Sequence, residues 1–152
     1  MKKEELIKKT IEELLKKMGY KEAAVEVREQ DSPSALIVSI QVDDANQLIG
    51  QSGSNLNDLQ RILRLLVVKK EAESPLFLVD INGYRAKREQ FLKELSQEIA
   101  EQVIKTKKSV MLQPMSSYER RIVHVELSGK PGIATESVGE EPERRIVIKP
   151  AY

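Results

Sequence analysis

Residues 48–68, LIGQSGSNLNDLQRILRLLVV, decide the architecture of this chain. Two glycines, Gly50 and Gly53, enclose Gln51 and Ser52 between a short apolar segment and a long amphipathic one. Glycine accepts positive φ and lets a partner's backbone approach closely, so the pattern predicts a sharp turn between two helices. Such a turn presents backbone N–H groups and the positive end of a helix dipole, which together favour a phosphate group.

The sequence around this turn predicts the other elements of residues 1–80. Apolar residues recur at helical spacing in three segments, and β-branched residues dominate two runs separated by turn-forming residues at 31–34. Asp43 or Asp44, and then Ser54, are the expected N-caps of the two helices that flank the glycine turn. The predicted helices cover 2–18, a short segment ending at Gly50, and 54–70, and the predicted strands cover 23–28, 35–42 and 75–80.

The order helix-strand-strand-helix-helix-strand, with G-x-x-G between the inner helices, is typical of a KH domain of type II. In a KH domain this loop holds about four nucleotides of a single strand. We therefore expect residues 1–80 to form an α+β KH domain, with a three-stranded sheet covered by helices on one face. Two arginines on the helix after the turn could supply charge, or they could be ordinary surface residues. The contacts expected in this half are Gly50, Gln51, Ser52, Gly53, Ser54, Asn55, Arg61 and Arg64.

Residues 81–152 predict a second, small α+β unit. Asn82 is expected to cap a long helix, and the capping-box pair Ser116 and Glu119 is expected to begin a shorter one. The predicted helices of this unit cover 82–107 and 117–127, and the predicted strands cover 110–112, 133–138 and 144–149.

The shorter helix of this second unit contains the residues best suited to bind nucleic acid. Arg120 and His124 are four positions apart and therefore lie on one face, with Arg121 inside the same arc of about 100°. Tyr118 and Val125 fall on the opposite side. Arginine binds phosphate or stacks on a base, and histidine stacks or donates a hydrogen bond. The alternative is a solvated helix face whose histidine is bonded to a neighbour.

The last predicted strand adds basic residues. Alternation places Arg145 and Lys149 on one face and Arg144 on the other. Arg145 and Lys149 are expected to contact nucleic acid. The alternative is a solvated edge strand, where basic side chains discourage aggregation.

Three separated motifs resemble one bacterial family. They are YERRIVH at 118–124, ESVGEEPERRIVIKP at 136–150 and VDINGYR at 79–85. Together they resemble the Jag-type (SpoIIIJ-associated) proteins, which combine a KH domain with an R-three-H (Arg-x-x-x-His) domain.

The resemblance implies a cytoplasmic regulator of RNA, linked to cell elongation and division. It implies single-stranded RNA as the ligand, with single-stranded DNA as the other possibility, and a small stand-alone KH protein as a partner. KH loops of this family usually contain a basic residue, whereas this chain has Gln51 and Ser52, so weaker phosphate contacts are expected. Many members have an additional N-terminal domain, so the chain is expected to be a short form or a fragment.

The charge balance limits how strongly this chain can attract a polyanion. The formal net charge is +1; residues 1–80 contain 12 basic and 14 acidic side chains, and residues 81–152 contain 13 and 10. Any electrostatic footprint is therefore a local patch on a nearly neutral body. A protein-interaction scaffold, in which the KH half mainly mediates dimerisation or partner binding, is the alternative function.

Composition and motifs argue against several other classes. With no cysteine and a single histidine, the sequence can form no disulfide and is unsuited to a zinc site. The G-x-x-G loop lacks the Lys-Ser/Thr ending of a nucleotide-binding P-loop, and no nucleophile lies at a suitable spacing from His124. No segment approaches the roughly 20 apolar residues of a membrane span, and the start is not a signal peptide. We expect a cytoplasmic, non-enzymatic protein without a cofactor or metal.

Overall fold

The computed structural model describes residues 2–30 and 35–151. The chain divides into two compact units, Met1–Arg85 (unit 1) and Ala86–Tyr152 (unit 2). Both units combine helices with a small sheet, which confirms the expected α+β class. The turn expected at 31–34 lies outside the described residues.

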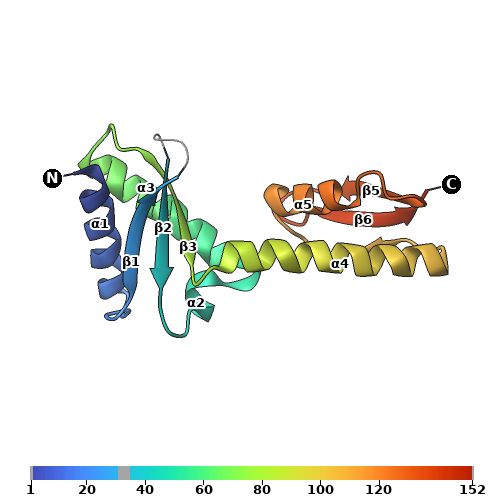
Figure 1. Ribbon diagram of the computed structural model, residues 1–152, viewed down its shortest axis with the longest axis horizontal. Helices are drawn as coiled ribbons and strands as arrows, with labels where there is room; N and C mark the ends of the chain where they lie inside the picture. Colours follow the sequence, from blue (N-terminus) through green and yellow to red (C-terminus); the bar gives the residue numbers. More distant parts are fainter. Residues whose placement is uncertain (1, 31–34, 152) are drawn as a thin grey trace. The chain divides into compact units, whose positions relative to one another are not determined.

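Unit 1 follows the order helix, strand, strand, helix, helix, strand, with one short 3₁₀ turn inserted (Figure 1). Its sheet has the order β1-β2-β3, in which β1 is antiparallel to β2 and β3 is parallel to β2. The long connection between the two parallel strands contains the glycine turn. The elements are α1 (Lys3–Lys17), β1 (Ala24–Glu29), β2 (Ala35–Gln41), α2 (Asn46–Ile49), η1 (Gln51–Gly53), α3 (Ser54–Lys70) and β3 (Leu76–Ile81).

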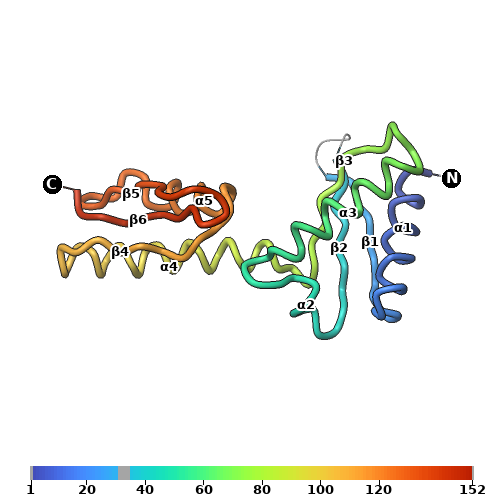
Figure 2. The backbone as a smooth tube through the Cα atoms, turned by 180° about the vertical axis from the view of Figure 1, so that it is seen from behind, coloured from blue at the N-terminus to red at the C-terminus, as the bar shows by residue number. Residues whose placement is uncertain are grey.

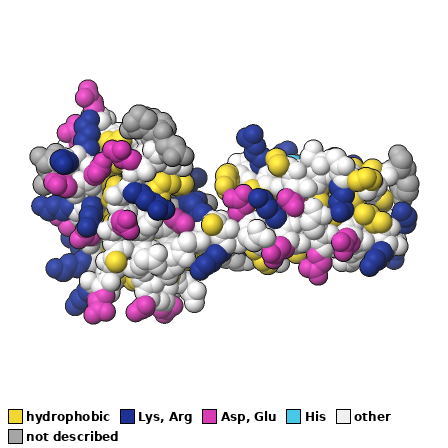
Figure 3. All heavy atoms as spheres, viewed as in Figure 1, with side chains coloured by type: hydrophobic (Ala, Val, Ile, Leu, Met, Phe, Trp, Pro, Cys, Tyr) yellow, Lys and Arg dark blue, Asp and Glu magenta, His cyan; other side chains and the backbone are white. Residues whose placement is uncertain are grey.

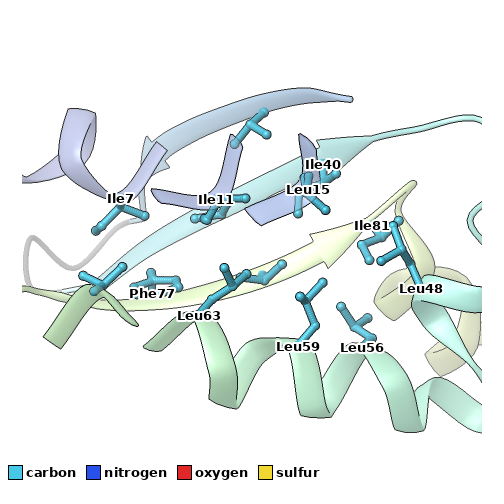
Figure 4. Packing of buried hydrophobic residues seen from close by; sticks show 14 of the residues in the cluster. Ile7, Ile11, Leu15, Ile40, Leu48, Leu56, Leu59, Leu63, Phe77 and Ile81 are labelled. Atoms are coloured by element: carbon cyan, nitrogen blue, oxygen red, sulfur yellow. The ribbon is translucent and has the colours of Figure 1, made fainter. Parts of the chain in front are cut away.

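The core of unit 1 lies on one face of its sheet. Alternate residues of β2 and β3 are buried, and their side chains meet the apolar stripes of α1 and α3 in a single cluster (Figure 4). Burying one such side chain contributes roughly 1.5–3 kcal/mol, so this face accounts for much of the stability of the unit. The cluster includes Ile7, Ile11, Leu15, Leu36, Val38, Ile40, Leu56, Leu59, Leu63, Val67, Phe77, Val79 and Ile81.

The outer edge of β3 is closed by a side chain rather than by another strand. Gln60 of α3 donates from Nε2 to Phe77 O at 2.8 Å, and its Oε1 accepts from Val79 N at 2.6 Å. Arg85 Nε donates to Val79 O at 2.9 Å. The Gln60 amide therefore satisfies this strand edge in the way a peptide group of a neighbouring strand would.

Two predicted N-caps beside the glycine turn are wrong. α2 begins at Asn46, and neither Asp43 nor Asp44 caps it, because the N-cap position is Ala45 and no side-chain cap bond forms. Ser54 is the first residue of α3, and the N-cap position is Gly53 in the left-handed region.

The long helix, α4 (Tyr84–Thr106), begins two positions after Asn82, the predicted cap. The Asn82 side chain pairs with the backbone of Val42, accepting from N at 3.0 Å and donating to O at 2.8 Å. Asp80 takes the capping role, because its Oδ1 accepts from Arg85 N at 3.1 Å. Asn82 therefore ties the end of β3 to the segment after β2.

Unit 2 contains most of α4 and a second three-stranded sheet. The sheet order is β4-β6-β5, with both pairs antiparallel (Figure 2). The alternative, that the last predicted strand is a solvated edge strand, is wrong. This strand lies between β5 and the two-residue β4 and pairs with both. The elements are β4 (Val110–Met111), α5 (Ser117–Leu127), β5 (Ile133–Val138) and β6 (Arg145–Pro150).

The buried stripe of α4 is built partly from small residues. Leu92, Ser96, Ala100 and Val103 face the core, and Ser96 Oγ donates to Leu92 O at 2.6 Å. Phe91 is half exposed, and its ring lies 5.2 Å from the Arg88 guanidinium carbon. Leu92, Ala100 and Val103 pack with apolar residues of α5, β5 and β6 in one core cluster.

Candidate nucleic-acid interface

The glycine turn of unit 1 requires both glycines because of its backbone angles and its contacts with other side chains of the unit. Gly50 and Gly53 have φ values of 72° and 78°, which side chains rarely adopt. A Cβ at Gly50 would lie 2.6 Å from Asn55 Cγ, and one at Gly53 would lie 2.9 Å from Tyr84 Cε1. The close approach that these glycines permit is therefore to the protein's own side chains.

The turn presents fewer free amides than the sequence predicts. Gly50 N donates to Asn46 O at 2.9 Å, Gly53 N donates to Gly50 O at 3.3 Å, and Ser54 N donates to Gln51 O. Gly53 is buried, whereas Gln51 is exposed. The exposed surface of the turn is thus formed by the two polar residues between the glycines, Gln51 and Ser52.

The remaining predicted contacts of unit 1 lie on α3. Asn55 Nδ2 donates to Gln47 O at 2.7 Å, so this side chain braces the turn between α2 and α3. Arg61 is strongly exposed and lies 3.9 Å from Asp58 Oδ1, a weak surface pair. Arg64 is half-buried, one turn beyond Gln60 on the flank of α3 nearest β3.

In unit 2, Arg120 is buried instead of lying on an exposed basic face. Its Nη1 donates to Met115 O at 2.8 Å, and its Nη2 lies 2.9 Å from Glu141 Oε1. His124, one turn along, is half-buried, with Nδ1 hydrogen-bonded to Thr135 Oγ1 at 2.6 Å. The Arg120/His124 face of α5 is therefore turned toward β5 and the loop before β6.

The start of α5 forms half of the predicted capping box. Ser116 Oγ accepts from Glu119 N at 3.3 Å. The Glu119 carboxylate, however, is buried and bonds Arg88 Nε of α4 at 2.9 Å instead of returning to the cap. Its other oxygen, Oε2, is buried without a hydrogen-bond partner within residues 2–30 and 35–151.

The basic residues at the end of the chain are paired with carboxylates of their own hairpin. Arg145 Nη2 lies 3.4 Å from Glu143 Oε2, and Lys149 Nζ lies 2.8 Å from Glu136 Oε2. The hydrogen bond from Lys149, together with its charge, lowers the pKa of Glu136 below the ordinary value. These pairs neutralise part of the charge expected to attract nucleic acid.

Arg121 differs from every other arginine in the described part of unit 2. It is exposed and has no hydrogen bond or ion pair, whereas Arg88, Arg120, Arg144 and Arg145 are all bonded. Tyr118, one turn before it, is 62% exposed. The sequence pattern placed Arg121 in the same arc as Arg120 and His124 and placed Tyr118 on the opposite side, whereas the structure leaves Arg121 and Tyr118 exposed and buries Arg120.

Charges of both signs alternate over the surface. Figure 3 shows Lys and Arg side chains interspersed with Asp and Glu on the face that it displays. None of the helices in residues 2–30 and 35–151 is long and apolar enough to cross a lipid bilayer. The same residues contain no group of three His, Asp or Glu side chains that could hold a metal ion.

Comparisons with known proteins place the chain in a family. Residues 90–150 match the model of the R-three-H domain. The chain is 36% identical over 148 residues to a Clostridium symbiosum protein named RNA-binding protein KhpB, covering 96% of this chain and 67% of that protein. It is 38% identical over 125 residues to the Bacillus subtilis protein of the same name, covering 81% of this chain and 60% of that protein.

A third protein of that name, from Lactiplantibacillus plantarum, is 36% identical over 101 residues, which is 66% of this chain and 31% of that protein. The chain thus spans about two thirds of the first two relatives and a third of the last. The chain belongs to the KhpB family, the Jag-type proteins that its three motifs resemble.

Proposed function

We propose that this protein binds single-stranded RNA and catalyses no reaction on it. Residues 1–80 would act as a type II KH domain and residues 81–152 as an R-three-H domain, in the cytoplasm. Its relatives are named RNA-binding proteins, and its second unit matches the model of the R-three-H domain. RNA, rather than DNA, is favoured by those names.

The observation that supports the KH assignment is the glycine turn at the start of α3. Gln51 is exposed three positions before the first residue of this 17-residue helix, near the positive end of its dipole. An RNA phosphate placed there would meet an amide side chain and a helix N-terminus but no lysine or arginine. We therefore expect weak, salt-sensitive binding at this loop.

The test adds the missing charge. Gln51→Lys should increase affinity several-fold for a labelled single-stranded RNA, and the salt slope of log K should steepen by about 0.7 for one added contact. Fluorescence anisotropy at two salt concentrations measures both quantities. Gln102→Lys, an equal charge change at an exposed position of α4, is the matched control.

Two outcomes would count against the proposal. Equal, weak binding of single- and double-stranded RNA by the unmodified protein argues against a single-strand binder. An identical gain from Gln51→Lys and Gln102→Lys would show that the loop does not contact phosphate. A Gly53 substitution is a poor test, because positive φ and the contact with Tyr84 would disturb the fold itself.

A second candidate function, protein pairing through unit 1, is favoured by the exposed side of α3. Ile62, Leu65 and Val68 are exposed by 49%, 71% and 39%, and they recur at every third position along the helix. Apolar side chains grouped on one helix face are typical of a contact surface. The occupant suggested by the family resemblance is a small stand-alone KH protein.

Light scattering of the protein alone and mixed with that partner tests pairing. Leu65→Lys should abolish a heteromeric peak, whereas Gln102→Lys should retain it. A heteromeric peak that survives Leu65→Lys would remove α3 from consideration. RNA binding by Leu65→Lys, measured in parallel, shows whether the two functions use separate surfaces.

A further inference from the structure

A shallow groove of about 280 Å³ runs between α4 and α5 within unit 2. It is lined on the α5 side by Tyr118, Arg121, Ile122 and Val125, and on the α4 side by Lys93. Tyr118 and Val125 are 62% and 66% exposed, and Ile122 is half-buried. Glu89 and Glu126 also line it, so the groove combines an aromatic ring, two aliphatic side chains, two cations and two carboxylates.

The two carboxylates at the groove are already engaged by other groups. Glu89 Oε1 lies 3.2 Å from Lys93 Nζ, and Glu126 Oε1 accepts from Gln97 Nε2 at 3.1 Å. Neither carboxylate is paired with Arg121. The Arg121 guanidinium therefore keeps all of its donors for a ligand, and they lie one helical turn from the Tyr118 ring.

This combination suits a nucleotide of a single strand. An exposed aromatic ring offers a face on which a base stacks, and a guanidinium offers a fork that matches a phosphate. Side chains three positions apart on a helix have Cβ atoms about 5–6 Å apart, so one nucleotide can reach both. Bases inside a duplex are stacked on each other and present no face to such a ring.

We propose that Tyr118, Arg121 and Val125 form a base-stacking subsite of unit 2 for single-stranded RNA. The base stacks on Tyr118, with Val125 extending the apolar floor, and Arg121 pairs with the neighbouring phosphate. Arg120 and His124, in contrast, hold α5 against the rest of the unit. This inference rests on the proposed RNA binding. It keeps Arg121 among the predicted contacts but replaces Arg120 and His124 with Tyr118 and Val125.

The test compares two probes on the full chain. One is a labelled single-stranded oligoadenylate, and the other is the same backbone without bases. Tyr118→Ala should lose about 10-fold in affinity for the oligoadenylate and almost none for the abasic probe. Tyr118→Phe keeps the ring and should bind as the unmodified protein does. Arg121→Gln should lose affinity for both probes and flatten the salt dependence.

The side chains of Tyr118 and Arg121 have no hydrogen bond or ion pair with other described residues, so both variants should melt at the unmodified temperature. If the unmodified protein binds oligoadenylate and Tyr118→Ala and Arg121→Gln bind it equally well, the subsite is overturned while RNA binding stands. If the unmodified protein binds neither probe, the proposed function fails and the subsite with it. If Tyr118→Ala and Arg121→Gln bind RNA unchanged but lose the heteromeric peak with the protein partner in light scattering, this face of α5 belongs to a protein partner and the subsite is overturned.

Discussion

Each unit contains a matched pair of residues of one type, of which one is bonded inside the unit and the other is free. In unit 2, Arg120 is buried and bonded to Met115 and Glu141, whereas Arg121, the next residue, is exposed and has no partner among the described residues. In unit 1, Gln60 closes the edge of β3, whereas Gln51 is exposed at the glycine turn.

These pairs separate residues that build the fold from residues available to a ligand. A buried polar group that loses its partner leaves a donor or acceptor away from water, which costs about 1–3 kcal/mol. Substitution of a free, exposed group costs no folding stability and removes only its contact with a ligand. Residue type alone does not distinguish the two members of a pair, but their hydrogen bonds do.

The largest effect is expected at Arg120. Arg120→Ala should lower the free energy of unfolding by about 3 kcal/mol, because Met115 O loses its donor and a buried side chain is removed. Arg121→Ala, its matched control, should stay within about 0.5 kcal/mol of the unmodified protein. Urea unfolding measures both variants. Equal destabilisation by the two would refute the distinction between the faces of α5.

The next effect is expected at the glycine turn. Gly53→Ala should cost about 2 kcal/mol, from the left-handed backbone and from the contact of the new Cβ with the Tyr84 ring. The same substitution in a Tyr84→Ala background should cost less, since only the backbone strain remains. A thermodynamic cycle from urea unfolding isolates the contact. A zero coupling energy would mean that the ring does not restrict Gly53.

A smaller effect is expected at the strand edge. Gln60→Ala should lower the free energy of unfolding by about 1.5 kcal/mol, because Phe77 O and Val79 N lose their partners but gain access to water. Gln51→Ala should change it very little. Amide hydrogen exchange at Val79 provides a local readout and should accelerate only in the Gln60 variant. Slow exchange of that amide in Gln60→Ala would contradict the capping role.

The smallest effect is expected at the exposed pair of Lys149 and Glu136. The folded-state pKa of Glu136 is lowered, so its stabilising contribution is present above the unfolded pKa and is lost as pH falls through the folded value. Lys149→Met should raise the pKa of Glu136 toward its ordinary value, as measured by NMR titration. Lys107→Met, far along the sequence, should leave it unchanged, and an equal shift in both variants would exclude a local cause.

Local sequence patterns predicted most of the elements. The helical spacing of Leu56, Leu59 and Leu63 predicted α3 with its end at Lys70, and β-branched residues predicted β2 with its start at Ala35. These predictions succeed because amphipathic period and turn chemistry depend on neighbours in the chain. Ile62 and Phe91 show the limit, since both have apolar character but lie on the exposed side of their helices.

The candidate site was harder to predict. The sequence pointed to Arg120 and His124 as exposed, but the orientation of α5 depends on which of its sides packs on β5. Val123 and Leu127 pack inward with Arg120, so Tyr118 is left outside. A helix of 11 residues with apolar side chains on two sides permits either orientation, and only the packing of the unit distinguishes them.

By itself, the sequence determined the α+β class, the glycine turn between two helices, and membership of a family through three separated motifs. Periodicity, glycine conformation and motif identity are properties of adjacent residues. Only the tertiary structure decided that Asn82 pairs with Val42, that Gln60 closes β3, and that Arg121 rather than Arg120 is free. Those choices depend on which distant groups compete for each hydrogen bond once the chain has folded.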